Sequence, residues 1–200
     1  MTDLAVRLLA LADEDIAVRN RLIDSGELFD GYHPHMAAVH SNNADALTAI
    51  IDAHGWPGRT LVGEKGAEAA WLIVQHAIGR PDFQRRCLTL IEASTAAGDM
   101  PGFCAAYLSD RIASFEGRPQ RYGTDFDWDD NGELSPSALE DAARVDEYRA
   151  QVGLGPLAER VQQMRQQAAA EGDRAPEDLP AWRRKRREWA KATGWIQDDD

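Results

Sequence analysis

Residues 69–76 read Ala69-Ala70-Trp71-Leu72-Ile73-Val74-Gln75-His76. The first six residues of this run are apolar, so a helix formed by them has no polar face and must be surrounded by other elements. The run therefore predicts a central helix over residues 64–78. Gln75 and His76 end it, and polar groups within core-like sequence are either paired structural groups or part of a site.

Helical periodicity continues on both sides of this segment. Apolar residues recur at three- and four-residue steps, and glycine or proline marks where each helix ends. The stripe of residues 3–24 consists of Leu4, Leu8, Leu11, Asp15, Val18 and Leu22. The other expected helices cover residues 35–53, 81–97, 101–115, 138–151 and 156–170. Residues 27–34, which include Phe29 and Tyr32, are expected to form a loop.

One segment breaks the helical pattern. Asp129-Asp130-Asn131-Gly132 lies between aromatic and apolar residues, and Asn-Gly in that setting is the strongest short signal for a β-hairpin. Asp127, Asp129, Asn131 and Gly132 also imitate the start of a calcium-binding loop, but the twelfth position counted from Asp127 is Ala138 instead of the required glutamate. We therefore expect a hairpin near residues 125–135. The predicted fold is mainly α, a single-core multi-helix domain with one short hairpin and a C-terminal basic helix.

The last thirty residues differ from the rest of the chain. Residues 1–170 are expected to form the helical domain, and residues 171–200 a linker, a basic helix and an acidic end. The basic helix carries Trp182, Arg183, Arg184, Lys185, Arg186, Arg187, Trp189 and Lys191. Such a helix can bind a nucleic acid or an anionic membrane surface, recruit a protein partner, or dock on its own acidic body through residues 180–195. Self-docking is favoured, because the chain is acidic overall.

Composition excludes several classes of protein. Lysine and arginine number 22 against 34 aspartate and glutamate residues, so the net charge is 22 − 34 = −12, and the body is not expected to bind nucleic acid. No signal peptide and no apolar run long enough to span a membrane are found. Cys87 and Cys104 lack metal-binding spacing, which is typical of reduced thiols in a cytoplasmic protein. The Gly-rich phosphate loops and the GxSxG nucleophile motif are absent.

Two residues are candidates for catalysis. His76 has a side chain that titrates near neutral pH, so it can act as an acid or a base. Asp110 can orient it, as carboxylates orient imidazoles in catalytic triads. The alternative is a satisfied core histidine and a partly buried ion pair.

Eight further residues are candidates for binding a substrate. Tyr107 shares a helix face with Asp110 by three-residue spacing and with Arg111 by four-residue spacing, and a guanidinium group can hold a carboxylate or a phosphate. The remaining candidates are Gln75, His54, Trp56, Gln120, Tyr122 and Thr124. Alternating residues of an extended segment share one face, so the last three can form one wall of a polar pocket. For each candidate a structural role is the alternative.

Metal binding finds little support in the spacing of possible ligands. All five histidines lie in the first 76 residues: His33, His35, His40, His54 and His76. His40 shares a helix face with Asn43, but no HExxH motif or Glu-x-x-His pair is present. Neither a metal nor another cofactor is therefore expected.

Several blocks of this sequence occur together, in the same order, in a known family. They are His54-Gly55-Trp56-Pro57, Leu61-Val62-Gly63, Ala70–Ala77, Phe83-Gln84, Ala106–Arg111 and Glu116–Thr124. On these blocks the chain resembles a bacterial domain-of-unknown-function family, number 6624, over most of residues 10–165. The chain departs from the family pattern at Ile16 and Asp125, where the family tends to have glutamine. The resemblance groups the protein and implies no activity.

Two functions remain open from the sequence. The first is a small-molecule enzyme with a polar pocket between helices, in which His76 is the acid or base and Arg111 an anchor for the substrate. The second is a non-catalytic binding or protein-interaction module that uses the same pocket or the C-terminal helix.

Overall fold

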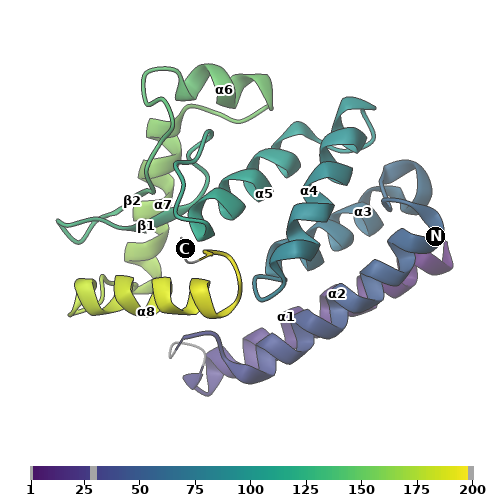
Figure 1. Cartoon of the computed structure of the whole chain (residues 1–200), viewed down its shortest axis with the longest axis horizontal. Coiled ribbons are helices and arrows are strands. Elements are labelled where there is room, and N and C mark those ends of the chain that lie inside the picture. The colour runs from purple at the N-terminus through teal and green to yellow at the C-terminus, as the bar shows by residue number, and fades with distance from the viewer. Residues whose placement is uncertain (1, 28–30, 198–200) are drawn as a thin grey trace. The chain divides into compact units, whose positions relative to one another are not determined.

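The computed structural model describes residues 2–27 and 31–197, and the fold in this part of the chain is mainly α-helical (Figure 1). It contains eight helices and one two-stranded antiparallel hairpin, which confirms the predicted fold class. The contacts divide the chain into two compact units, residues 1–100 and residues 101–200. Phe29 of the expected loop lies outside the described residues.

The helices of the first unit are α1 (Asp3–Asp24), α2 (Pro34–His54), α3 (Arg59–His76) and α4 (Pro81–Ala96). The second unit contains α5 (Gly102–Phe115), β1 (Phe126–Trp128), β2 (Leu134–Pro136), α6 (Val145–Gln151), α7 (Leu157–Glu171) and α8 (Leu179–Ala192). In the described residues, no helix is both long enough and apolar enough to cross a membrane.

Two helices begin at other positions than the sequence predicts. Helix α3 begins five residues earlier, at Arg59. It has a kink at Gly63, whose φ of 73° is a backbone conformation that glycine adopts readily and other residues rarely do. Helix α6 begins at Val145 instead of residue 138, because the preceding chain pairs with residue 120. There the Gln120 N–H donates to the Ala138 carbonyl, and the Glu140 N–H donates to the Gln120 carbonyl.

Helix α3 packs against α1, α2 and α4 and forms the centre of the first unit, as its apolar sequence predicts. Ile73 and Val74 are buried against a core that includes Leu8 of α1 and Leu47 of α2. A methyl group at Gly66 would lie 3.2 Å from the Ala5 Cβ atom, so small residues let α1 and α3 approach closely. In Figure 1, α1 and α2 run side by side along this unit.

The hairpin of the second unit turns at Asp129–Gly132, where the Asn-Gly signal predicts it. Residue Phe126 is paired with Pro136, and Trp128 with Leu134. The Asp129 carboxylate accepts hydrogen bonds from the N–H groups of Asn131 and Glu133 at 2.8 and 3.0 Å, which fixes the turn.

Helix α8 and the short segment that follows it, which includes Trp195, dock within the second unit through arginine and tryptophan side chains. Arg183 pairs with Asp130, and Arg186 with Asp127, each at 2.6 Å. The rings of Trp189 and Trp195 lie 5.4 and 5.1 Å from the ring of Phe115. These contacts tie α8 to the body of its unit. The expected domain boundary near residue 170 stays a prediction.

The docking of α8 can be tested with two tryptophan variants. Trp195 is 2 % exposed, so Trp195→Ala should lower the free energy of unfolding of the second unit by about 3–5 kcal/mol. Trp182 is 36 % exposed and serves as the control, for which Trp182→Ala should cost less than about 1 kcal/mol. Urea unfolding followed by circular dichroism measures both. Equal, small effects would show that α8 does not stabilise its unit.

Candidate functional site

The first unit brings together three titratable side chains from three helices. Asp15 comes from the middle of α1, His40 from α2, and His76 is the last residue of α3. One possible ligand atom from each lies within 4.8 Å of the other two. Asp15 is completely buried, because it occupies a core-facing position in the apolar stripe of its helix.

The Asp15 carboxylate links the two imidazole rings. His76 Nδ1 lies 3.0 Å from Asp15 Oδ2 and forms a hydrogen bond with it. His40 Nε2 lies 3.4 Å from the same oxygen, in contact but without hydrogen-bond geometry. The other nitrogen of His40, Nδ1, is hydrogen-bonded to the Tyr32 hydroxyl at 2.8 Å. The order of contacts is thus Tyr32, His40, Asp15, His76.

Electrostatics keeps Asp15 ionised and Tyr32 protonated. Burial acts to raise the pKa of Asp15, but the interactions with His40 and His76 outweigh it and hold this pKa well below its usual range. Burial, together with the negative charge of Asp15, raises the pKa of Tyr32 well above its usual range. At neutral pH the cluster therefore contains a buried carboxylate beside a neutral phenol.

The ionised state of Asp15 determines which nitrogen of His76 carries the proton. An ionised carboxylate only accepts hydrogen bonds, so His76 Nδ1 must be the donor. In the neutral ring, Nε2 then carries a lone pair. The His76 side chain is 28 % exposed, whereas that of Asp15 is 1 % exposed. His76 is thus the member of this pair that a dissolved molecule can reach.

Neighbouring side chains hold the end of α3 in place. Gln84 of α4 donates hydrogen bonds to the carbonyl groups of Val74 and Gln75, at 2.6 and 3.4 Å. Gln75 itself is buried, so this candidate for substrate binding lies inside the unit next to His76. On α2, Asn43 donates to the Leu11 carbonyl of α1 at 3.1 Å, one turn before Asp15. Backbone contacts thus fix the positions from which the cluster side chains project.

Asp110 belongs to the second unit and organises a loop there. Its Oδ1 atom accepts hydrogen bonds from the N–H groups of Arg121 and Tyr122, at 2.9 and 3.1 Å. Its Oδ2 atom accepts from the N–H and hydroxyl of Thr124, at 2.9 and 3.0 Å. Burial raises the pKa of Asp110, against the opposing effect of these hydrogen bonds. The carboxylate that His76 contacts is Asp15.

The side chain of Gln120 also serves the loop. It donates to the carbonyl groups of Asp125 and Ser137, both at 2.9 Å, and accepts from the Asp125 N–H at 2.9 Å. The buried Arg149 donates to the Tyr122 carbonyl at 2.7 Å and to the Gly155 carbonyl at 2.6 Å. The side chain of Gln120, which the sequence suggests for a pocket wall, is thus bonded to the protein's own backbone, and the Thr124 hydroxyl is bonded to Asp110.

The other candidates occupy separate positions. Tyr107 is half-buried, with its ring edge-on to Phe103. Burial lowers the pKa of Arg111, and the nearby Asp125 opposes this effect. His54 is exposed at the end of α2. The Trp56 ring nitrogen is buried and makes no hydrogen bond within residues 2–27 and 31–197. Their roles in binding stay predictions.

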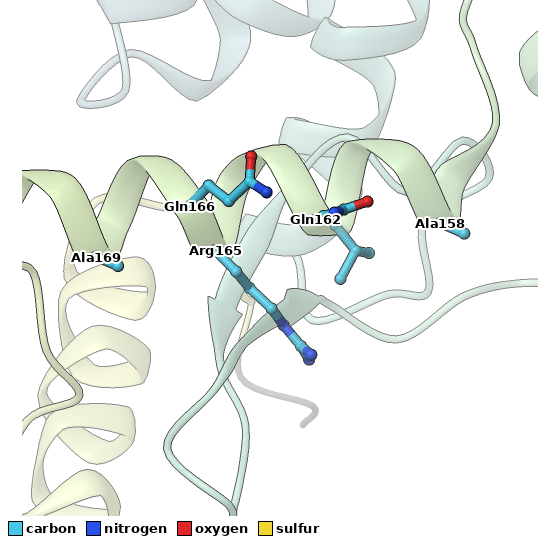
Figure 2. A pocket seen from close by; sticks show the side chains of 6 residues that line it. Ala158, Gln162, Arg165, Gln166 and Ala169 are labelled. Atoms are coloured by element: carbon cyan, nitrogen blue, oxygen red, sulfur yellow. The ribbon is translucent and has the colours of Figure 1, made fainter.

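A surface hollow of about 440 Å³ lies along α7 (Figure 2). Its lining residues are Ala158, Val161, Gln162, Arg165, Gln166 and Ala169. Arg165 is the one titratable residue among them, and it is bonded to Leu134, Ser135 and Glu133 of the hairpin. The hollow therefore offers no acid–base pair.

The sequence offers His76 as a candidate but does not indicate that Asp15 and His40 lie beside it. Asp15 was visible as the one charged residue in the apolar stripe of residues 3–24, a position that predicts a buried carboxylate. In the sequence, His40 shares a helix face with Asn43 and carries no further signal. Tyr32 lies in an expected loop, and no pattern in the sequence links it to His40.

The structural role of Asp110 can be tested by truncation. Asp110→Ala leaves three backbone N–H groups without their acceptor, so the free energy of unfolding should fall by roughly 3–5 kcal/mol. Thr124→Val removes only one hydroxyl donor and should cost about 1 kcal/mol. Chemical denaturation measures both. A loss below about 1 kcal/mol for Asp110→Ala would show that the loop does not depend on this carboxylate.

The lowered pKa of Asp15 predicts a pH dependence of stability. Its contribution is fully present above the unfolded-state pKa of about 3.9 and is lost as the pH falls through the lower folded-state pKa. Between pH 5 and pH 3.5 the wild type should therefore lose more free energy of unfolding than Asp15→Asn. The other carboxyl groups are common to both proteins, so the difference isolates Asp15. Equal losses would contradict the shift.

Comparison with known proteins adds a family and no activity. No curated protein and no solved structure matches the chain. The model of a family described as a family of unknown function, DUF6624, matches residues 2–171, which include the whole Tyr32–His40–Asp15–His76 cluster. The resemblance seen in the sequence blocks is thereby confirmed, and the chain belongs to the DUF6624 family.

Proposed function

We propose that the protein is a small-molecule enzyme in which His76 transfers a proton to or from the substrate. The observation that carries this proposal is the 3.0 Å hydrogen bond between His76 Nδ1 and the buried Asp15 carboxylate. A carboxylate in this position orients the ring, selects its tautomer and stabilises the charged imidazole that forms when Nε2 takes a proton. Asp15 thus has the orienting role that the sequence suggests for Asp110.

His40 and Tyr32 act as positioning residues in this proposal. His40 is 8 % exposed, and its Nε2 atom contacts the same Asp15 oxygen that is hydrogen-bonded to His76. The Tyr32 hydroxyl holds the far nitrogen of the same ring at 2.8 Å. Because the carboxylate is buried and in contact with both rings, its orientation should change little when His76 gains or loses a proton.

The charge of the chain bears on the class of substrate. A net charge of −12 repels polyanions and favours small neutral or cationic molecules. The reaction class that needs only an oriented imidazole is proton transfer or general-base hydrolysis.

The proposal predicts a selective loss of activity. His76→Gln should lower kcat by about 10²–10⁴-fold on any substrate the protein turns over, because a general base contributes a factor of that size. The side chain is 28 % exposed, so the melting temperature should change little. A panel of chromogenic esters, lactones and phosphodiesters, assayed with purified full-length protein, provides the measurement.

The matched control is His35→Gln, since His35 is an exposed histidine of α2 outside the cluster. It should retain full activity. Turnover that survives in His76→Gln would exclude His76 as the proton-transfer group. A panel without turnover, combined with specific binding of a small molecule that requires His76, would favour the non-catalytic binding module.

A further inference from the structure

The cluster in the first unit has the donor set of a transition-metal site. It offers two imidazole nitrogens and one carboxylate oxygen from three helices, all within 4.8 Å of one another. Three protein ligands of this type leave positions open for water or substrate, as in catalytic zinc sites and in the two-histidine, one-carboxylate sites of other divalent metals. The three side chains project from α1, α2 and α3, so the set is preorganised.

Two of the three separations between donor atoms fit a shared ion. Donor atoms held about 2.1 Å from one metal, with angles of roughly 90–110°, lie about 3.0–3.4 Å from each other. The Asp15 Oδ2 atom lies 3.0 Å from His76 Nδ1 and 3.4 Å from His40 Nε2.

A second observation points to a ligand at the same place. Asp15 Oδ1 and His40 Nε2 are buried, and neither makes a hydrogen bond within residues 2–27 and 31–197. Asp15 is 0 % and His40 8 % exposed, so water cannot readily satisfy these atoms. A buried polar atom without a partner costs roughly 1–3 kcal/mol. A cation held by Asp15 Oδ2 and His40 Nε2 would satisfy the imidazole nitrogen, and a carboxylate that bound it through both oxygens would also satisfy Oδ1.

Tyr32 supplies the outer contact that metal-binding histidines need. Its hydroxyl lies 2.8 Å from His40 Nδ1, so His40 can direct Nε2 toward Asp15 while Nδ1–H donates to the phenol oxygen. Such outer contacts fix the ring and the tautomer of a ligating histidine.

We propose that Asp15, His40 and His76 bind one divalent transition-metal ion of the zinc class. Two imidazole ligands disfavour magnesium and calcium, which prefer oxygen donors. The metal site stands on this geometry alone. Its use in a reaction rests on the function proposed above. With the ion bound, His76 Nδ1 would be a ligand instead of a hydrogen-bond donor to Asp15, and the metal would take over activation of the substrate or of water at the same cluster.

The test uses the full chain, stripped with chelator and titrated with Zn²⁺. Isothermal titration calorimetry and elemental analysis should find one ion per chain with a dissociation constant below about 1 μM. Asp15→Asn, His40→Gln and His76→Gln should each weaken binding by at least tenfold, and Tyr32→Phe by about 10-fold, through loss of the outer contact. His35→Gln is the control and should bind as the wild type does. Magnesium at the same concentration should not compete.

A measurement on the wild type covers variants that fail to fold. Zn²⁺ should shift the ring resonances of His40 and His76 in NMR spectra and leave those of His35 and His54 unchanged. Stoichiometric Co²⁺ should produce the visible absorption bands of a four- or five-coordinate ion. No binding tighter than about 100 μM, or binding abolished by His35→Gln and retained by His40→Gln, would overturn the proposal.

The failure of this inference and that of the proposed function give different results. If the chelated protein still turns over a substrate through His76 and binds no Zn²⁺, the enzyme proposal stands and the metal site is excluded. If Zn²⁺ binds at the three residues and no substrate is converted with or without it, the metal site stands and the enzyme proposal fails.

Discussion

The buried carboxylate of Asp15 constrains the whole first unit. It occupies a position in α1 where the helix otherwise presents apolar side chains to the core, and it is fully buried. A buried charge is tolerated only when it is paired, so α2 and α3 must present His40 and His76 to this point of α1. The packing of the three helices and the geometry of the polar cluster therefore depend on each other.

In the second unit, similar buried polar residues have a different role. There, Asp110, Gln120 and Arg149 are buried polar side chains whose partners are backbone groups of an irregular loop. In sequence, both sets look alike, as polar residues among apolar ones. In the structure, the two sets differ in whether buried polar atoms are left without a hydrogen bond. In the first unit, Asp15 and His40 each retain a buried atom that makes no hydrogen bond within the described residues, and His76 faces solvent.

Much of the fold follows from local patterns in the sequence. Three- and four-residue spacing with glycine and proline stops locates the helices, and Asn131-Gly132 locates the hairpin turn. Local patterns do not locate the start of α6, because residues 138–140 are hydrogen-bonded to Gln120, a contact between segments that are separated in the sequence. Local patterns do not indicate the partner of His76 either. Asp15 lies 61 residues away along the chain, and no local pattern predicts which helices pack together.

The net charge of the cluster depends on whether it holds a proton or a metal ion, and this charge affects which substrates it can bind. With both histidines neutral, Asp15 leaves the cluster with one buried negative charge. A single proton on an imidazole compensates this charge. Such a site suits a neutral or cationic substrate. A divalent ion instead changes the sum to −1 + 2 = +1, and an anionic ligand then brings the site to neutrality. The acidic body opposes the approach of anions only over distances comparable to the Debye length of about 8 Å at physiological ionic strength, so a small anion can still reach a metal at this site. Whether the site prefers cationic or anionic small molecules therefore depends on whether a proton or a metal compensates Asp15.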